Sequence, residues 1–314
     1  MRIGLDAMGG DFAPKSTIEG ALLALTEIAS DDIIVLFGDR SILEKELEER
    51  NATLSRFEIV HAPEKILTGD QPSKVLVQKP NSSIALGYGY LKAKKIDSFC
   101  SAGHSGAMMV GAIYVIGLIE GIMRPCITNP IPKEDGGIGI LLDAGINSDV
   151  KPELLQQFGI IGSLYAQHVH NIKTPRIGLV NIGHEEDKGN LLSLAAHKLM
   201  SEDKEMNFVG NVEPRDFFKD KADVMVCDGF TGNIILKLSE TLFRTFAKRF
   251  GADDPFLSRF NYENYGGTPI LGIDNTVLLG HGISNGKAIK SMLLFSKHIF
   301  NAGLVQKIAG ALKN

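Results

Sequence analysis

Short apolar runs alternate with segments of helical periodicity along most of the chain, and polar turns rich in glycine join them. The apolar runs predict strands, and they lie at residues 3–7, 33–37, 57–61, 98–100, 137–143, 177–181, 222–227 and 277–279. The periodic segments predict helices, and they lie at residues 16–28, 41–50, 83–94, 106–120, 152–165, 191–200, 233–250 and 285–299. Strands that alternate with helices are typical of an α/β fold, so we expect a three-layer sandwich around a mainly parallel sheet.

Local signals set the expected ends of some of these elements. Ser41, with Glu44 three residues later, has the form of a capping box, which places the start of a helix at Ser41. Glycine and proline residues predict a loop over residues 67–83, and three prolines predict an extended segment between 125 and 132. The apolar run at 107–119 is too short to span a bilayer, so it predicts a buried core helix.

Five of the apolar runs end in a glycine-rich polar turn that leads into a helical segment. These turns occupy residues 6–11, 101–106, 143–147, 181–190 and 228–233. In an open parallel sheet, such turns gather at the carboxyl ends of the strands, where these sheets bind ligands. Backbone N–H groups at the starts of helices favour anions there. The pattern therefore points to an enzyme that acts on a phosphate-like group at one edge of one sheet.

Length and composition describe an ordinary folded protein. A chain of 314 residues is long enough to bury roughly 75% of its unfolded surface, as one large domain or as two packed lobes. The net charge of −4 argues against a general nucleic-acid-binding role. The three cysteines, Cys100, Cys126 and Cys227, form no C-x-x-C pair and are typical of reduced, buried thiols. Residues 1–6 lead straight into a strand pattern without a leader-like segment, so we expect a cytoplasmic protein.

Several common active-site motifs do not occur. No G-x-G-x-x-G follows a predicted strand and no G-x-x-x-x-G-K-[ST] is present, so neither a dinucleotide site nor a P-loop is expected. Residues 184–188 do not match H-E-x-x-H, and residues 103–106 lack the second spacer of the G-x-S-x-G nucleophile elbow. His168 and His170 are two residues apart, a spacing that we interpret as surface histidines rather than metal ligands. We therefore expect no metal ion.

The remaining turns suit chemistry in which phosphate itself is the nucleophile. Phosphate is largely dianionic near neutral pH, so it needs bound hydrogen-bond donors rather than a strong general base. Lys188 and Asn190 follow one predicted strand, and Thr231 and Asn233 follow another. Lysine binds phosphate as a compact charge, and asparagine donates to an oxyanion without titrating.

Each of these residues also has a purely structural interpretation. Lys188 is compatible with a solvated turn, and Asn233 with a helix N-cap. Asp6 and Asp11 are of a type that often forms turns, and His104 suits a polar turn. Spacing alone does not decide between these interpretations.

Taken in order, several segments closely resemble the bacterial phosphate acyltransferase family, that is, acyl-acyl carrier protein:phosphate acyltransferase. The similar segments are 6–11, 101–107, 141–145, 181–190, 210–213, 223–233, 265–269 and 281–284. They run through nearly the whole chain, and as a set they are far more specific than any one turn. The resemblance implies one domain over residues 1–314, folded like isopropylmalate dehydrogenase and phosphate acetyltransferase, with a helical hairpin extension at about 238–262.

The resemblance also implies a reaction. Inorganic phosphate would attack the thioester of a long-chain acyl carrier protein, and the acyl phosphate would feed phospholipid synthesis through a glycerol-phosphate acyltransferase. The resemblance implies no metal and no organic cofactor. It further implies a homodimer and peripheral association with the inner face of the cytoplasmic membrane. The expected partners are therefore acyl carrier protein, inorganic phosphate and a second copy of the chain.

The family's pattern assigns roles to particular residues. Lys188 and Asn233 are the expected catalytic residues, with Lys188 holding the phosphate and Asn233 orienting the phosphate or the thioester carbonyl. The expected substrate-binding residues are Asp6, Gly9, Gly10, Asp11, Gly103, His104, Ser105, Asn190, Asp228 and Thr231.

Two features depart from the family's pattern. The usual Ser-Ala-Gly-Asn-Thr-Gly turn is here Ser-Ala-Gly-His-Ser-Gly, so His104 replaces an amide with a titratable ring. The segment before residues 262–267 is shorter than is common in the family. In the helix that precedes it, apolar residues share one side and basic residues lie near them. The apolar residues are Leu242, Phe243, Phe246 and Phe250, and the basic ones are Arg244, Lys248 and Arg249. Such a helix suits either a membrane surface or a partner subunit.

Two other functions are compatible with the same pattern. One is a short-chain phosphate acyltransferase that uses coenzyme A, and the other is a non-catalytic membrane scaffold of lipid synthesis. A dehydrogenase is disfavoured, because the nucleotide motif and a metal-binding carboxylate cluster are missing. Acyl carrier protein is acidic, so basic residues near the acyl entrance are expected to contact it. The candidates for this contact are Arg244, Lys248, Arg249, Lys287 and Lys290.

Overall fold

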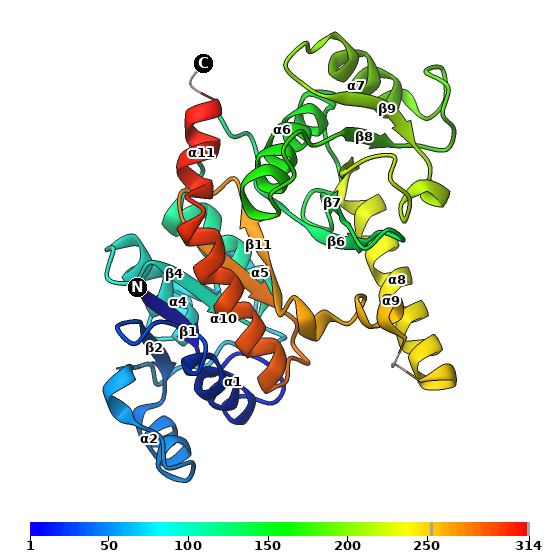
Figure 1. The fold of residues 1–314 in the computed structure, drawn as a ribbon. Helices are drawn as coiled ribbons and strands as arrows, with labels where there is room; N and C mark the ends of the chain where they lie inside the picture. Colours follow the sequence, from blue (N-terminus) through cyan, green and yellow to red (C-terminus); the bar gives the residue numbers. More distant parts are fainter. Residues whose placement is uncertain (252–253, 313–314) are drawn as a thin grey trace. The chain divides into compact units, whose positions relative to one another are not determined.

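The computed structural model describes residues 1–251 and 254–312. The chain divides into two compact units, each assembled from two stretches of sequence (Figure 1). The first unit comprises residues 1–119 and 262–305, and the second comprises residues 120–261 and the chain from Gln306 onward.

The first unit is built on a mainly parallel sheet. Its strands are β1 (Arg2–Asp6), β2 (Ile33–Gly38), β3 (Phe57–His61), β4 (Ser98–Ser101), β11 (Gly267–Leu271) and β12 (Thr276–Gly280). They lie in the order β3-β2-β1-β4-β12-β11, and β11 alone of these is antiparallel to its neighbour. The helices are α1 (Lys15–Leu25), α2 (Arg40–Glu48), α3 (Pro72–Gln78), α4 (Ser83–Lys92), α5 (Ser105–Val110) and α10 (Gly286–Asn301). Short 3-10 turns lie at Leu54–Arg56 and Tyr262–Asn264, and α11 (Leu304–Ala311) follows α10.

An aromatic cluster forms part of the core between α4 and this sheet. Phe99 on β4 meets Phe37 of β2 and Tyr88 of α4 edge to face, with ring centroids 5.8 and 5.2 Å apart. All three side chains are fully buried. Edge-to-face aromatic packing of this kind adds to the free energy of burial.

Helices α1 and α10 pack side by side (Figure 1), because Gly20 of α1 lets Ile289 of α10 approach its backbone.

The second unit has its own sheet. The strands of this unit are β5 (Cys126–Ile127), which is not part of this sheet, and β6 (Asn129–Pro132), β7 (Ile138–Leu142), β8 (Ile177–Val180), β9 (Phe208–Val212) and β10 (Val224–Val226). Five of them form the order β6-β7-β10-β8-β9, with β6 antiparallel to β7 and the other pairs parallel. The helices are α6 (Pro152–Val169), α7 (Leu191–Glu202), α8 (Gly229–Phe250) and α9 (Pro255–Ser258), and a 3-10 turn lies at Pro214–Asp216.

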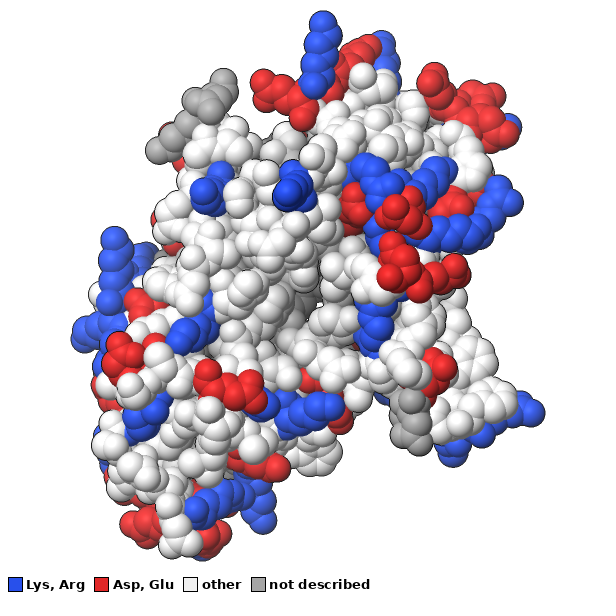
Figure 2. All heavy atoms as spheres, in the orientation of Figure 1, with Lys and Arg blue, Asp and Glu red and all other residues white. Residues whose placement is uncertain are grey.

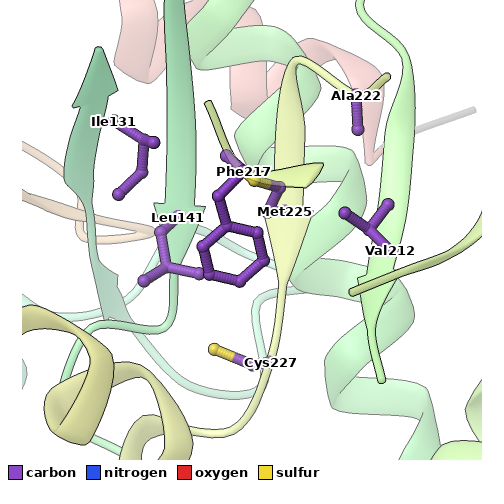
Figure 3. Packing of buried hydrophobic residues seen from close by; sticks show 7 residues of the cluster. All are labelled: Ile131, Leu141, Val212, Phe217, Ala222, Met225 and Cys227. Carbon is purple, nitrogen blue, oxygen red and sulfur yellow. The ribbon is translucent and has the colours of Figure 1, made fainter. Parts of the chain in front are cut away.

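A compact apolar cluster joins the strands of the second sheet (Figure 3). Its buried members are Ile131, Leu141, Val212, Phe217, Ala222, Met225 and Cys227. The Phe217 ring lies between Leu141 of β7 and Met225 of β10 (Figure 3). These contacts fix β7 and β10 side by side, and so fix the turns that follow them.

The structure confirms the α/β class and the strands predicted from periodicity, with shifts of one or two residues at their ends. The expectation of one sheet edge was wrong, because the turns at 6–11 and 101–106 belong to the first sheet and the other three turns belong to the second. The predicted hairpin extension at about 238–262 contains the second half of α8 and all of α9. Residues 252 and 253 of that extension lie outside the described residues.

Several predicted element ends were also wrong. Asp39, not Ser41, caps α2, and it accepts hydrogen bonds from the backbone of Ser41 and Ile42. The predicted core helix at 106–120 ends earlier, since α5 passes into a π-helical turn over Gly111–Ile116 and stops at Gly117. Gly117 has a φ of 100°, which side-chain-bearing residues rarely adopt. The predicted loop at 67–83 contains α3, and strands β9 and β11 were not predicted.

Candidate active site

Three of the glycine-rich turns lie at the carboxyl ends of neighbouring strands in the second unit. Strand β10 runs between β7 and β8 and is parallel to both. The turns at 143–147, 181–190 and 228–233 follow β7, β8 and β10 in that order along the chain. Lys188, Asn190, Asp228, Thr231 and Asn233 therefore all lie at this one edge, and open parallel sheets bind ligands at edges of this kind.

Asp143 is the centre of the turn that follows β7. Its carboxylate accepts backbone hydrogen bonds from Ile127, Gly145, Ile146 and Asn147 at 2.6–3.3 Å, and the Asn147 side chain donates a further one at 2.9 Å. Burial raises the pKa of Asp143, and the N–H donors act in the opposite direction. Asp143 therefore braces the turn from within, a role that sequence reasoning did not assign to it.

Helix α8 begins in direct contact with this braced turn. A Cβ on Gly229 would lie 2.8 Å from Asp143 Oδ2, and a Cβ on Gly232 would overlap the backbone carbonyl of Asp143. Only glycine at these positions lets the helix approach so closely. The first turn of α8 is thereby held on the 143–147 turn.

Asn233 lies in the second turn of α8 and is exposed to solvent. A Cβ on Gly145 would be 3.2 Å from Asn233 Oδ1, so the side chain lies over the turn that follows β7. Within residues 1–251 and 254–312, the amide of Asn233 makes no hydrogen bond. The alternative that Asn233 is a helix N-cap was wrong, because Asp228 caps α8.

Asp228, Thr231 and Asn190 are engaged in capping the two helices. Asp228 accepts hydrogen bonds from Thr231 N at 2.9 Å and Thr231 Oγ1 at 2.7 Å. Asn190 caps α7 by accepting from Ser193 N at 2.9 Å and Ser193 Oγ at 3.1 Å. These three residues therefore shape the edge, since Asp228 and Asn190 accept from backbone N–H groups and the Thr231 hydroxyl donates to Asp228.

Lys188 is exposed, and its stem crosses Gly183, where a Cβ would lie 2.8 Å from Lys188 Cγ. Its backbone N–H donates to Glu185 O at 3.2 Å, and its carbonyl accepts from Asn181 Nδ2 at 3.1 Å. In the part of the chain that the structure describes, its ammonium group has no ion pair. The backbone of Lys188 is thus fixed while its charge remains available to a ligand.

The first unit carries the other two turns, at the carboxyl ends of the adjacent parallel strands β1 and β4. Asp6 is 1% exposed and accepts hydrogen bonds from Ser101 Oγ at 2.7 Å and Met8 N at 3.1 Å. Burial raises the pKa of Asp6, against the lowering effect of its hydrogen bonds. A Cβ on Gly9 or on Gly103 would collide with the Asp6 carboxylate, so Asp6 joins the two turns from beneath.

The Gly9–Gly10–Asp11 turn is closed by a third segment. Asp11 N donates to Gly282 O at 2.7 Å, and Gly10 has a φ of 107°. The Asp11 side chain is exposed. Of the residues expected in this turn, Gly9 and Gly10 therefore supply backbone geometry, and Asp11 presents its carboxylate to solvent.

His104 is the N-cap of α5, which starts at the exposed residue Ser105. Its Nδ1 accepts from Ala107 N at 3.2 Å, which places the ring proton on Nε2, facing Asp70 O at 3.2 Å. Asparagine is also a favoured N-cap, so the asparagine expected from the resemblance and the histidine present here can both cap this helix. The ring additionally ties α5 to the loop that contains Asp70.

The other reactive side chains give no alternative centre. All three cysteines are buried, as the sequence indicated, and burial raises the pKa of Cys100 to about 12. A thiol protonated in this way is a poor nucleophile. Among the described residues, no group of three or more histidine, cysteine or acidic side chains is arranged to hold a metal ion.

Comparison with known proteins identifies the family. A family model described as "Fatty acid synthesis protein" matches residues 1–307. The chain is 44% identical over 307 residues to "Phosphate acyltransferase" from Caldicellulosiruptor saccharolyticus, with 92% of this chain and 91% of that protein covered. The fold is similar to that of a phosphotransacetylase from Streptococcus pyogenes, with a TM-score of 0.65 at 16% identity over 95% of this chain and 94% of that one. A 4-hydroxythreonine-4-phosphate dehydrogenase from Klebsiella pneumoniae has a TM-score of 0.58 at 13% identity, over 96% of this chain and 97% of that one. The chain therefore belongs to the phosphate acyltransferase family and is an acyltransferase.

Proposed function

We propose that the protein transfers a long-chain acyl group from the thioester of acyl carrier protein to inorganic phosphate. A phosphate oxygen attacks the thioester carbonyl carbon, the new C–O bond forms, and the C–S bond breaks. The proton of hydrogen phosphate ends on the departing thiolate, so the products are acyl phosphate and free carrier-protein thiol. The step needs no metal and no organic cofactor.

One observation carries the assignment of the catalytic residues. Lys188 and Asn233 present an ammonium group and a neutral amide at the carboxyl ends of adjacent strands, and neither group has a side-chain partner among the described residues. The charge of Lys188 suits the phosphate dianion. The amide of Asn233 suits the oxyanion that forms on the attacked carbonyl, or the phosphate itself. We therefore propose that Lys188 binds phosphate rather than serving only as a solvated turn residue.

The remaining substrate-binding residues act through the shape of the turns. Asn190, Asp228 and Thr231 hold the starts of α7 and α8 at the second sheet's edge. In the first unit, Gly9, Gly10, Asp11 and Gly103 with His104 and Ser105 form the corresponding edge, braced by Asp6. We propose that the turns of the first unit contact the acyl donor.

Carrier protein is the proposed donor because the matching family is one of fatty acid synthesis, in which acyl chains travel as carrier-protein thioesters. The basic residues proposed to contact carrier protein differ in whether an acidic side chain pairs with them. Lys287 pairs with Glu263 at 3.5 Å, Lys290 pairs with Glu27, and Arg244 pairs with Glu240 at 3.6 Å. The end of α8, which carries Lys248 and Arg249, shows a concentration of basic side chains (Figure 2).

Helix α8 also supports the proposed membrane contact and homodimer. Apolar side chains are exposed at every fourth position along it, at Phe230, Ile234, Leu238, Leu242, Phe246 and Phe250. Within the described residues, no helix has both the length and the apolar character needed to cross a membrane. An exposed apolar row beside basic residues suits peripheral binding to the inner face of the cytoplasmic membrane, or a second copy of the chain. The acyl phosphate would then pass to a glycerol-phosphate acyltransferase.

The test is a comparison of acyl donors at saturating phosphate. Purified protein is given a long-chain acyl carrier protein or a short-chain acyl coenzyme A, and the acyl phosphate is separated from the remaining thioester and measured as its hydroxamate. A higher kcat/KM with the carrier-protein thioester supports the proposal, and a higher value with coenzyme A favours the short-chain alternative. If Lys188→Ala and Asn233→Ala together leave cellular function intact, the protein acts as a scaffold.

A further inference from the structure

Two asparagines, one directly after β8 and one within β9, donate hydrogen bonds to the turn that carries Lys188. Asn181 follows β8 directly and is 6% exposed, and Asn211 lies within β9 and is 2% exposed. β8 and β9 are adjacent and parallel, with Leu179 opposite Asn211. Both side-chain amides therefore lie close enough to donate to backbone carbonyls of the 181–190 turn.

The contacts fall on the two ends of a single tight turn. Asn211 Nδ2 donates to Glu185 O at 2.8 Å, and Asn181 Nδ2 donates to Lys188 O at 3.1 Å. Glu185 O also accepts from Lys188 N at 3.2 Å. Consequently both backbone polar groups of Lys188 are tied to a buried asparagine, one directly and one through Glu185 O.

Two neighbouring residues, Ile182 and Gly189, fit the side-chain amide of Asn181. Asn181 Oδ1 accepts from Ile182 N at 2.9 Å, which orients the amide with its nitrogen toward Lys188 O. Gly189 has a φ of 103°, and a Cβ there would lie 2.5 Å from Asn181 Oδ1. The chain thus leaves Lys188 through a glycine that fits against the asparagine.

We propose that Asn181 and Asn211 are positioning residues that hold the Lys188 turn in the geometry that binds phosphate. This inference rests on the proposed function, in which Lys188 holds phosphate. A lysine on a fixed backbone loses less conformational freedom when its ammonium group meets the dianion. Together these two asparagines, the clamp, contribute to phosphate affinity although neither touches the substrate.

The experiment uses Asn181→Asp and Asn211→Asp, which replace the donor nitrogen with an acceptor of similar size. Asn207→Asp is the matched control, because Asn207 Nδ2 donates to Pro175 O at 3.2 Å in the same unit, before β9 begins. Hydrogen exchange of the amides at 183–189 is measured in the substrate-free protein. KM for phosphate, KM for the acyl donor and kcat are measured for each variant.

We expect both clamp variants to raise KM for phosphate about tenfold, the effect of losing one net hydrogen bond. KM for the acyl donor should change less, and exchange at 183–189 should accelerate, while Asn207→Asp resembles the parent. If either variant does not fold, Asn181→Ser and Asn211→Ser remove the amide without adding charge. Parental exchange in the turn, or a parental KM for phosphate despite faster exchange, would overturn the inference. Because exchange is measured without substrate, a failure of the clamp is distinct from a failure of Lys188 as phosphate ligand.

Discussion

Asn233 lies directly against Gly145, so that a Cβ on Gly145 would come 3.2 Å from the Asn233 amide oxygen. Gly145 has a φ of 139°, a conformation that favours glycine. The turn after β7 therefore passes beneath the second turn of α8 with no side chain between them. The position of the Asn233 amide is set by this contact between helix and turn.

Gly232 is the tightest point of that contact. A Cβ there would overlap the Asp143 carbonyl, which is backbone and has no room to rotate away. We expect Gly232→Ala to lower the free energy of unfolding by about 3 kcal/mol, as overpacking does in well-packed interiors. Gly89→Ala is the control, because Gly89 lies in α4 with nothing within 4 Å of its would-be Cβ. It should change stability by about 1 kcal/mol or less, in the stabilising direction. Urea denaturation of both variants makes the comparison, and equal losses would show that the contact is not as close as described.

Lys188→Ala should weaken phosphate binding and slow the reaction together. The loss of a charge that holds the dianion in the transition state should lower kcat/KM for phosphate about a hundredfold. Lys198→Ala on α7 is a matched control, since Lys198 is an exposed lysine 4.0 Å from Glu202. Steady-state kinetics at varied phosphate decides the point. Parental phosphate kinetics in Lys188→Ala would show that Lys188 does not bind phosphate.

Asn233 and Asn190 should respond differently to the same substitution. Asn233→Ala removes a donor with no structural partner among the described residues, so we expect turnover to fall about a hundredfold with stability unchanged. Asn190→Ala removes the α7 cap and should cost about 1 kcal/mol of stability. Its turnover at low temperature should stay within about tenfold of the parent. Thermal melting and initial rates are measured on both variants. A loss of stability in Asn233→Ala and a loss of turnover in Asn190→Ala would show that Asn190, not Asn233, is the catalytic residue.

The ion-pair cluster at Asp223 predicts a particular acid response. Burial alone would raise the pKa of Asp223, but hydrogen bonds from Arg176 and Lys133 outweigh it and hold the pKa at about 2. A folded-state pKa below the unfolded one gives stability that is present above the unfolded value and is lost as pH falls through the folded value. The contribution is about 2 kcal/mol.

Asp223→Asn tests this expectation. The difference in unfolding free energy between parent and variant should be constant above about pH 4 and should narrow toward about pH 2. Urea unfolding of the two proteins across this range measures it. Parallel curves down to the lowest pH would show that the Asp223 carboxylate does not drive the acid response.

The sequence predicted those parts of the fold that depend on local periodicity. Most strands and helices were found, and Lys188 lies in a turn after a strand, as predicted. Asn233 lies within α8 instead, because that helix begins at Gly229 rather than at residue 233. Helix α3 was missed because Pro72 was interpreted as a loop residue, although proline is tolerated in a first helical turn. Strand β9 was missed because Gly210 and Asn211 interrupt its apolar run.

Features that depend on distant pairing were not predictable in this way. The division into two sheets depends on which strands pair, and local periodicity does not specify strand pairing. Asp143 accepts a hydrogen bond from Ile127, and Asn211 reaches Glu185, across 16 and 26 residues respectively. Asp143 and Asn181 do carry one local signal, since each is a polar residue directly at the end of an apolar run.

The central claim is that phosphate is the acyl acceptor, and the most direct measurement counts both products of that reaction together. Long-chain acyl carrier protein is mixed with the purified protein, with and without phosphate, and acyl phosphate and free carrier thiol are quantified over time. The account predicts that the two appear in equal amounts, only with phosphate present. Thiol release that is independent of phosphate, or release without acyl phosphate, would contradict it.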